Sequence, residues 1–336
     1  MRVDPLLKAL ADPTRLRIMR LLAHMELAVG ELAQVLGQSQ PRVSRHVRIL
    51  CDAGLAARRK EGSWVFLSSA ISERRAPPLG TAAARLLAVA EEDDASFAGR
   101  CAEDRRHLAA IRATREETAE AYFARHAAQW DTLRVLHSPD EPVEKALAAA
   151  LGNGSLGALL DVGTGTGRMA ELFAQSSTHV TAFDKSPEML RIARARLQHL
   201  PADLVNLVQG DFTALPFGED AFDTVLFHQV LHYAFDPETV LVEAARVTRP
   251  GGSIAVVDFA AHDREELRER HAHARLGFSD EQMLELLSEA GFTGEAAVAL
   301  PGRPLTVKIW TGRKTSSTPA RKNVRADIPF ATGNTR

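Results

Sequence analysis

The sequence predicts an α/β protein that consists of an N-terminal winged helix-turn-helix domain, a helical connector and a doubly wound sheet. Three observations predict this organisation: a basic, helix-rich head, a strand that runs into three alternating glycines, and apolar strands that alternate with helices after residue 151. The expected boundaries are residues 1–75 for the winged helix-turn-helix, 76–150 for the connector, 151–312 for the sheet domain and 313–336 for a disordered tail.

Charge is unevenly distributed along the 336 residues. The first 75 hold 13 Lys and Arg against 7 Asp and Glu, whereas the whole chain holds 41 and 43. This asymmetry is typical of a nucleic-acid-binding head on a more acidic body. The N-terminus lacks the apolar core of a signal peptide, no run of about 18 apolar residues occurs, and Cys51 and Cys101 are too few for a disulfide framework. We therefore expect a cytoplasmic protein with free thiols and no membrane partner.

The head predicts two helices around a short turn. Asp12 before Pro13 is typical of a helix N-terminus, and a short helix is expected over residues 30–36. Ser39 then precedes a helix expected over residues 40–53. This order of elements indicates a helix-turn-helix.

The second of these helices has the pattern of a DNA-reading helix. Val43, Val47 and Leu50 repeat at i, i+4 and i+7 and are expected to face the core. The opposite face, and a hairpin expected over residues 55–67 as a wing, carry side chains suited to base edges and phosphates. The expected DNA-binding residues are Gln40, Arg42, Ser44, Arg45, Arg48, Arg58, Arg59 and Lys60. A merely solvated helical face is the alternative.

Three stretches of the head resemble the ArsR/SmtB family of winged-helix repressors: Pro41 to Leu50, Ala53-Gly54-Leu55 and Glu61-Gly62-Ser63-Trp64-Val65. The resemblance implies a homodimer that binds double-stranded operator DNA and releases it when an effector binds. Arsenic-sensing members have a Cys-Val-Cys motif where this chain reads Leu27-Ala28-Val29-Gly30-Glu31. Because a soft metal needs two or three thiolates, no metal site is expected.

The connector is rich in Ala, Arg, Glu and Leu over residues 81–137 and predicts at least two helices. Such helices would supply the two-fold interface that a palindromic DNA site requires, or would only space the domains. Candidates for a dimer interface are Leu6, Leu7, Leu10, Leu86 and Leu87.

The stretch over residues 159–168 predicts a strand, a tight loop and the start of a helix. Its glycines, Gly163, Gly165 and Gly167, would let a ligand lie against bare backbone near the N–H groups of the helix. A dinucleotide fingerprint would need Gly or Ala where the chain has Arg168. An ordinary tight strand-to-helix turn is the alternative.

Polar residues follow the later strands, which are expected over residues 179–183, 204–208, 222–227 and 253–259, with helices over 187–197 and 237–248. Ligands of parallel sheets bind beyond the carboxyl ends of the strands. Asp184 there suits two ribose hydroxyls, Asp211 suits an adenine amino group, and His228 follows the next strand.

In order and spacing, five elements resemble the motif series of class I S-adenosylmethionine-dependent methyltransferases: the loop from Asp161 to Gly167, Asp184, Gly210-Asp211-Phe212, His228-Gln229 and Pro250-Gly251-Gly252. The resemblance implies a Rossmann-like sheet that binds S-adenosyl-L-methionine (SAM) or S-adenosyl-L-homocysteine (SAH), covered by a preceding helix with Tyr122. The expected cofactor-binding residues are Tyr122, Asp161, Gly163, Thr164, Gly165, Gly167, Asp184, Lys185, Met189, Gly210, Asp211, Phe212 and His228. For Tyr122, Phe123 and Trp130, simple core packing is the alternative.

The catalytic residues are not determined by the sequence, because methyl transfer needs little beyond alignment of the acceptor and, at times, a base. Candidates are His228, His232 and His262. His228 and His232 lie at i and i+4 and would pair on a helix, or one would face the cofactor while the other packs. The combined resemblances predict a transcriptional regulator that senses SAM or SAH. The alternative is an active methyltransferase for a small-molecule acceptor with an autoregulatory DNA-binding head.

Overall fold

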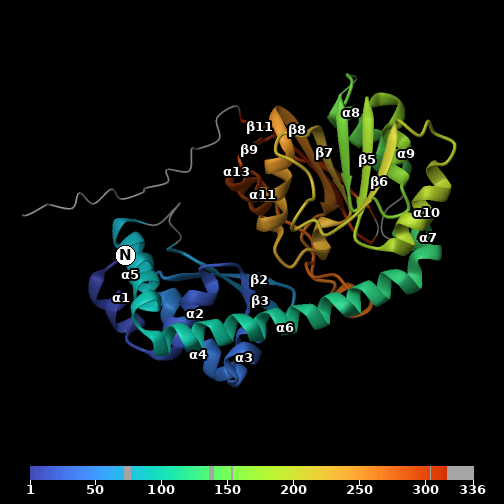
Figure 1. Cartoon of the computed structure of the whole chain (residues 1–336). Coiled ribbons are helices and arrows are strands. Elements are labelled where there is room, and N and C mark those ends of the chain that lie inside the picture. Colours follow the sequence, from blue (N-terminus) through green and yellow to red (C-terminus); the bar gives the residue numbers. More distant parts are fainter. Residues whose placement is uncertain (72–76, 136–139, 153, 303, 316–336) are drawn as a thin grey trace, which may run out of the picture.

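The computed structural model describes residues 1–71, 77–135, 140–152, 154–302 and 304–315. A helical head with a small sheet is joined to a body with a larger sheet by α5 (Pro78–Asp93) and the long helix α6 (Ala95–His126) (Figure 1). With 32 residues, α6 is long enough to reach from the head to the body. Its length is about 48 Å at a rise of about 1.5 Å per residue.

Capping and turn residues set the helix boundaries of the head. Asp12 accepts a hydrogen bond from the backbone N–H of Arg15 at 3.0 Å, and Gly37 ends a helix with a left-handed φ of 62°. Ser39 occupies the predicted N-cap position, but its side chain makes no capping hydrogen bond. The elements are α1 (Val3–Leu10), α2 (Pro13–Leu22), β1 (Leu27–Ala28), α3 (Val29–Leu36), α4 (Gln40–Asp52), β2 (Ala56–Glu61) and β3 (Trp64–Ser69). The predicted helix-turn-helix and wing are therefore confirmed, with the strands ordered β1-β3-β2.

Part of the apolar surface expected at a dimer interface lies in the core instead. Leu6, Leu10 and Leu87 are at most 7% exposed, because α1 and α5 close the core of the head around α2 and α4. The prediction is wrong for these three leucines. Leu7 and Leu86 are 54% and 56% exposed and remain accessible to a partner.

The body is built on a sheet ordered β10-β11-β8-β7-β4-β5-β6, with β9 also paired to β11. The strands from β8 to β6 are parallel, as predicted, whereas β11 runs antiparallel to β8. The strands are β4 (Ala158–Val162), β5 (His179–Asp184), β6 (Val205–Gln209), β7 (Phe222–His228), β8 (Thr248–Phe259), β9 (Phe292–Gly294), β10 (Val298–Leu300) and β11 (Val307–Lys314). The last strand ends at Lys314, beyond the boundary expected at residue 312. Of the tail expected over residues 313–336, residues 316–336 lie outside the described residues.

Helices cover both faces of this sheet (Figure 1). Side chains of α8, α9 and α10 share one apolar core, and those of α11 and α13 share the other. The helical elements are η1 (Ala127–Gln129), α7 (Trp130–Val135), α8 (Asp140–Leu151), α9 (Arg168–Phe173), η2 (Ala174–Ser176), α10 (Pro187–Leu197), η3 (Leu231–Tyr233), α11 (Pro237–Val247), α12 (Glu265–Arg270) and α13 (Asp280–Ala290). The doubly wound arrangement leaves the carboxyl ends of the parallel strands open to the C-terminal half of α6.

Candidate functional site

A cavity of about 820 Å³ lies at the carboxyl ends of the parallel strands. Small-molecule sites typically enclose about 300–1,000 Å³. Of the predicted cofactor-binding residues, the cavity is lined by Tyr122, Asp161, Gly163, Thr164, Gly165, Asp184, Lys185, Met189, Asp211, Phe212 and His228. Gly167 and Gly210 are not among its lining residues, because they pack against the protein instead. A Cβ there would lie 3.1 Å from Ala193 or 2.8 Å from Phe183, respectively.

The loop between β4 and α9 requires glycine. Gly163 has a φ of 69°, and a Cβ there would lie 2.3 Å from Val230. Its N–H donates to the carbonyl oxygen of Phe183 at 2.8 Å. Gly165, with a φ of 55°, faces the indole of Trp130, which a Cβ would approach to 3.5 Å. Main chain is thus exposed to the cavity, as a close-fitting ligand would require.

Two carboxylates brace this loop. Asp161 is 1% exposed and accepts a hydrogen bond from the hydroxyl of Thr164 at 2.6 Å. Asp184 accepts the N–H of Gly165 on one oxygen and that of Ser186 on the other, both at 2.8 Å. Burial raises the pKa of Asp184, although these backbone hydrogen bonds oppose the shift. The N–H of Lys185 also contributes, and because a carboxylate offers about four acceptor positions, Asp184 can still accept from a ligand hydroxyl.

Lys185 links α6 to the strand ends. Its Nζ lies 2.9 Å from Glu120, 3.3 Å from Glu116 and 3.2 Å from Asp211. Partial burial opposes protonation, but these carboxylates prevail and raise the pKa of Lys185. Burial likewise opposes ionisation of Asp211, whose pKa is nevertheless lowered by hydrogen bonds from Thr213 and Lys185. The Lys185 side chain therefore orders one rim of the cavity.

Aromatic rings line another wall of the cavity. The ring of Phe123 meets those of Tyr233 and Trp130 edge-on, with centroids 4.9 and 5.4 Å apart. The hydroxyl oxygen of Tyr122 lies 2.8 Å from Nδ1 of His271. All five residues line the cavity, so Tyr122, Phe123 and Trp130 form a cavity wall.

The three candidate catalytic histidines have separate environments. His228 ends β7 and His232 lies in η3, and both line the cavity. Of the two arrangements left open for His228 and His232, pairing on one helix does not occur, because Gln229 takes a φ of 53° between the strand and η3. His262 is not among the lining residues, and burial lowers its pKa to about 4. Among the described residues, no group of three or more His, Cys, Asp and Glu is placed to hold a metal ion.

The predicted DNA-reading face is exposed on α4. Its five polar positions are Gln40, Arg42, Ser44, Arg45 and Arg48, and all are exposed. On the wing, Arg58 and Lys60 are exposed. Arg59 instead lies 3.1 Å from Glu26 and 2.6 Å from Glu61. Its guanidinium is thus engaged within the chain.

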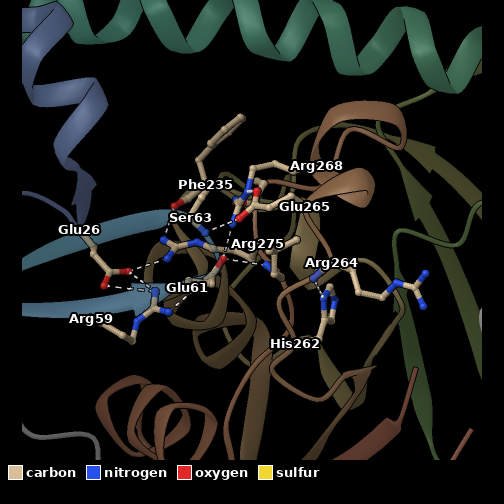
Figure 2. Close-up of polar contacts among 12 residues, drawn as sticks. Glu26, Arg59, Glu61, Ser63, Phe235, His262, Arg264, Glu265, Arg268 and Arg275 are labelled. Atoms are coloured by element: carbon tan, nitrogen blue, oxygen red, sulfur yellow. Dashed lines mark hydrogen bonds and ion pairs between the residues drawn. The ribbon is translucent and has the colours of Figure 1, made fainter. Parts of the chain in front are cut away.

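The tip of the wing is docked on the body (Figure 2). Glu61 is 5% exposed and accepts hydrogen bonds from Arg268 at 2.9 Å and from the N–H of Leu276 at 2.7 Å. The N–H of Ser63 donates to Glu265 at 2.5 Å. We call residues 265–276, which include α12, the cap segment. Sequence patterns did not identify this contact, although Glu61 is the one acid among the cations of the wing strand.

Arg275 anchors the cap segment to the head. It is 1% exposed, and it donates to Glu26 at 2.6 Å and to the carbonyl oxygen of Phe235 at 2.8 Å (Figure 2). Its guanidinium also lies over the ring of Phe66, 4.4 Å from the centroid. Burial opposes ionisation of Glu26, but Arg275 and Arg59 prevail and lower its pKa.

The same cap segment borders the cavity. His271 and His273 line the cavity, whereas Arg275 reaches the head. The backbone N–H groups of Ala274 and Arg275 donate to the carbonyl oxygen of His232 at 3.1 and 2.9 Å. The cap segment therefore contacts both the cavity and the head.

A winged helix-turn-helix joined to a doubly wound sheet with a glycine-loop cavity defines a two-domain chain with a ligand-binding body. Residues 12–58 match the arsR family of bacterial regulatory proteins, and residues 160–256 match the methyltransferase domain. The chain thus carries an ArsR-family helix-turn-helix and a methyltransferase domain, and the second match supports the predicted cofactor class, SAM or SAH.

Individual proteins resemble parts of this chain. A demethylmenaquinone methyltransferase of Tropheryma whipplei is 33% identical over 46% of this chain and 61% of its own length. One of Renibacterium salmoninarum is 36% identical over 30% of this chain and 41% of its own length. A solved 1,6-didemethyltoxoflavin-N1-methyltransferase of Burkholderia thailandensis is 26% identical over 60% of this chain and 89% of that one, with a TM-score of 0.47. The chain thus spans only about half the length of the two sequence relatives. In the described part of the chain, no helix has the length and apolarity that crossing a bilayer requires.

Proposed function

We propose that this protein is a DNA-binding transcriptional regulator whose methyltransferase domain binds SAM or SAH and transmits that occupancy to the wing. One observation carries the proposal: the cap segment lines the cavity with His271 and His273 and contacts the wing through Arg268, at Glu61, and Arg275, at the ring of Phe66. A ligand alters DNA affinity only if it binds the DNA-competent and DNA-free conformations unequally. The cap segment is placed to make that difference.

The cavity fits the proposed ligand in two respects. The face of Gly165 toward the cavity is bare main chain, and a side chain there would approach Trp130. Asp184 and Asp211 border the same cavity from neighbouring strands, and both carboxylates have lone pairs to accept ligand hydroxyl or amino groups. We propose Asp184 for the ribose hydroxyls and Asp211 for the adenine amino group.

The docked wing predicts the sign of regulation. Because Glu265 and Arg268 cover the turn of the wing, DNA that contacts this turn must displace them. A nucleoside that stabilises the docked arrangement should therefore weaken DNA binding. Allosteric coupling of this kind typically changes affinity about 5- to 150-fold.

Fluorescence anisotropy tests the proposal with a duplex selected from random-sequence DNA by the full chain. The titration is repeated with SAM, with SAH and with neither, at one fixed salt concentration, because phosphate contacts make affinity strongly salt-dependent. We expect at least one nucleoside to lower DNA affinity. Identical affinities in all three titrations would refute the regulatory proposal.

A further inference from the structure

A buried acid–histidine pair lies at the wall of the cavity. Asp258, the penultimate residue of β8, is 0% exposed, and His232 in η3 is 2% exposed. Nδ1 of His232 lies 2.7 Å from one oxygen of Asp258, and the N–H of His232 donates to the other oxygen at 3.0 Å. The N–H of Phe259 adds a third hydrogen bond, at 2.8 Å. Three hydrogen bonds thus use the carboxylate to hold the imidazole and the turn that carries it.

This arrangement determines which nitrogen of His232 is available. An ionised carboxylate only accepts hydrogen bonds, so the proton of the neutral imidazole lies on Nδ1. Nε2 then carries the free lone pair. It is buried and has no hydrogen-bond partner among the described residues, although His232 lines the cavity. A polar atom in this state is suited to accept a proton from a ligand.

The surroundings of His232 indicate the shape of that ligand. The ring centroids of Tyr233, His273 and Phe259 lie 4.1, 4.2 and 5.1 Å from the centroid of the His232 imidazole. Phe123 extends this wall by contact with Tyr233. Aromatic walls favour a flat aromatic guest, and a buried lone pair favours a guest with a proton to give.

We propose that Asp258 and His232 form the general base of a methyl transfer from SAM to a flat aromatic acceptor with a weakly acidic hydroxyl. In this step the hydroxyl oxygen attacks the methyl carbon, the carbon–sulfur bond breaks, and its electron pair neutralises the sulfonium to give SAH. Nε2 of His232 takes the hydroxyl proton and later releases it to water. Asp258 holds the imidazole and stabilises the imidazolium. The inference rests on the SAM binding proposed above and adds an activity to it.

Proton transfer can be observed without methyl transfer. 4-Nitrophenol absorbs visible light as the phenolate but not as the phenol. We would titrate it into the full chain saturated with SAH, in a buffer whose pH lies below the pKa of free 4-nitrophenol. We expect the phenolate band with the wild type and with His199→Gln, whose side chain is largely exposed. We expect it to be lost in His232→Gln and reduced in Asp258→Asn. Absence of the band in the wild type, or an equal band in His232→Gln, would overturn the inference.

Methyl transfer provides the second readout. Radiolabelled SAM would be supplied with quercetin, caffeate or 1,4-naphthohydroquinone, and SAM affinity would be measured separately by calorimetry. We expect methylation of at least one acceptor by the wild type. In His232→Gln, kcat/KM should fall about 100-fold or more, while SAM affinity stays unchanged. SAM binding with no methylated acceptor, or equal rates in wild type and His232→Gln, would overturn the inference. Failure of the wild type to bind SAM would instead refute the proposed cofactor site.

Discussion

Nη1 of Arg275 lies 2.6 Å from a carboxylate oxygen of Glu26, although 249 residues separate them in the chain. Arg275 is buried, and Glu26 pairs at the same time with Arg59 of the wing. The contact therefore joins the cap segment, the head and the wing at one point. A substitution of Arg275 can therefore test whether the two domains are coupled.

Arg275→Met should uncouple the two domains. The variant keeps an unbranched apolar side chain but removes the hydrogen bonds to Glu26 and Phe235, and hydrogen bonds to charged groups contribute about 1.5–3 kcal/mol. DNA affinity should no longer respond to SAM or SAH in anisotropy titrations. Arg264→Met is the matched control, because Arg264 pairs with the neighbouring Glu266 at the surface. A nucleoside response that survives in Arg275→Met would show that coupling takes another route.

Arg45→Ala should weaken DNA binding and lower its salt dependence. Arg45 is exposed on α4, and one lost phosphate contact reduces the slope of log K against log salt by about 1. Anisotropy at several salt concentrations measures both quantities. Arg194→Ala, exposed on α10 in the body, should leave both unchanged. If Arg45→Ala binds DNA as the wild type does, α4 is not the recognition helix.

Asp184→Asn should weaken SAM and SAH binding about 10-fold or more while the body stays folded. The substitution removes the charge from the side chain that braces Gly165 and faces the cavity. Charge-assisted hydrogen bonds are roughly twice as strong as neutral ones. Calorimetry gives the affinity and circular dichroism the fold, with the exposed Asp203→Asn as control. Unchanged affinity would place the nucleoside elsewhere.

Trp130 should report ligand entry. Its indole lies beside Gly165 at the cavity, whereas Trp310 is buried in the sheet and hydrogen-bonded to Asp280. Because Trp64 lies under Arg268 in the wing, the test uses a Trp64→Phe background. Addition of SAH should change tryptophan fluorescence in Trp64→Phe/Trp310→Phe, where Trp130 is the remaining tryptophan, and the change should be absent in Trp64→Phe/Trp130→Phe. A response that persists there would mean that the ligand does not contact this wall.

His262 should make the protein less stable in mild acid. Its pKa falls from 6.5 in the unfolded chain to about 4 because burial disfavours the imidazolium. The unfolded state therefore binds the proton more readily, and the stabilisation present above pH 6.5 is lost progressively as pH falls toward 4. Urea unfolding across this window should show a smaller loss for His262→Gln than for the wild type. The control, His199→Gln, should follow the wild type, and identical slopes for all three proteins would contradict the assignment.

Local patterns predicted most of the fold. The 3.6-residue period placed Val43, Val47 and Leu50 in the core, and the expected strands all form. The strand-end rule also brought Asp161, Asp184 and Asp211 to one cavity. Such features follow from the backbone geometry of a helix or a parallel sheet, which a short stretch of sequence specifies.

Other features depended on contacts that no local pattern contains. Leu87 is buried, and Arg59 is paired with Glu26 and Glu61, because distant segments close over them. Gln229, with its positive φ, separates two histidines that the spacing would place on one helix.

By itself, the sequence determined the two domain types, the cofactor class and the residues at the strand ends. Only the tertiary structure decided that the wing docks on the cap segment and that Asp258 orients His232. The reason is physical. Helix and strand periods are set by backbone geometry over a few residues, whereas burial and pairing of a charged side chain depend on which remote surface excludes water from it.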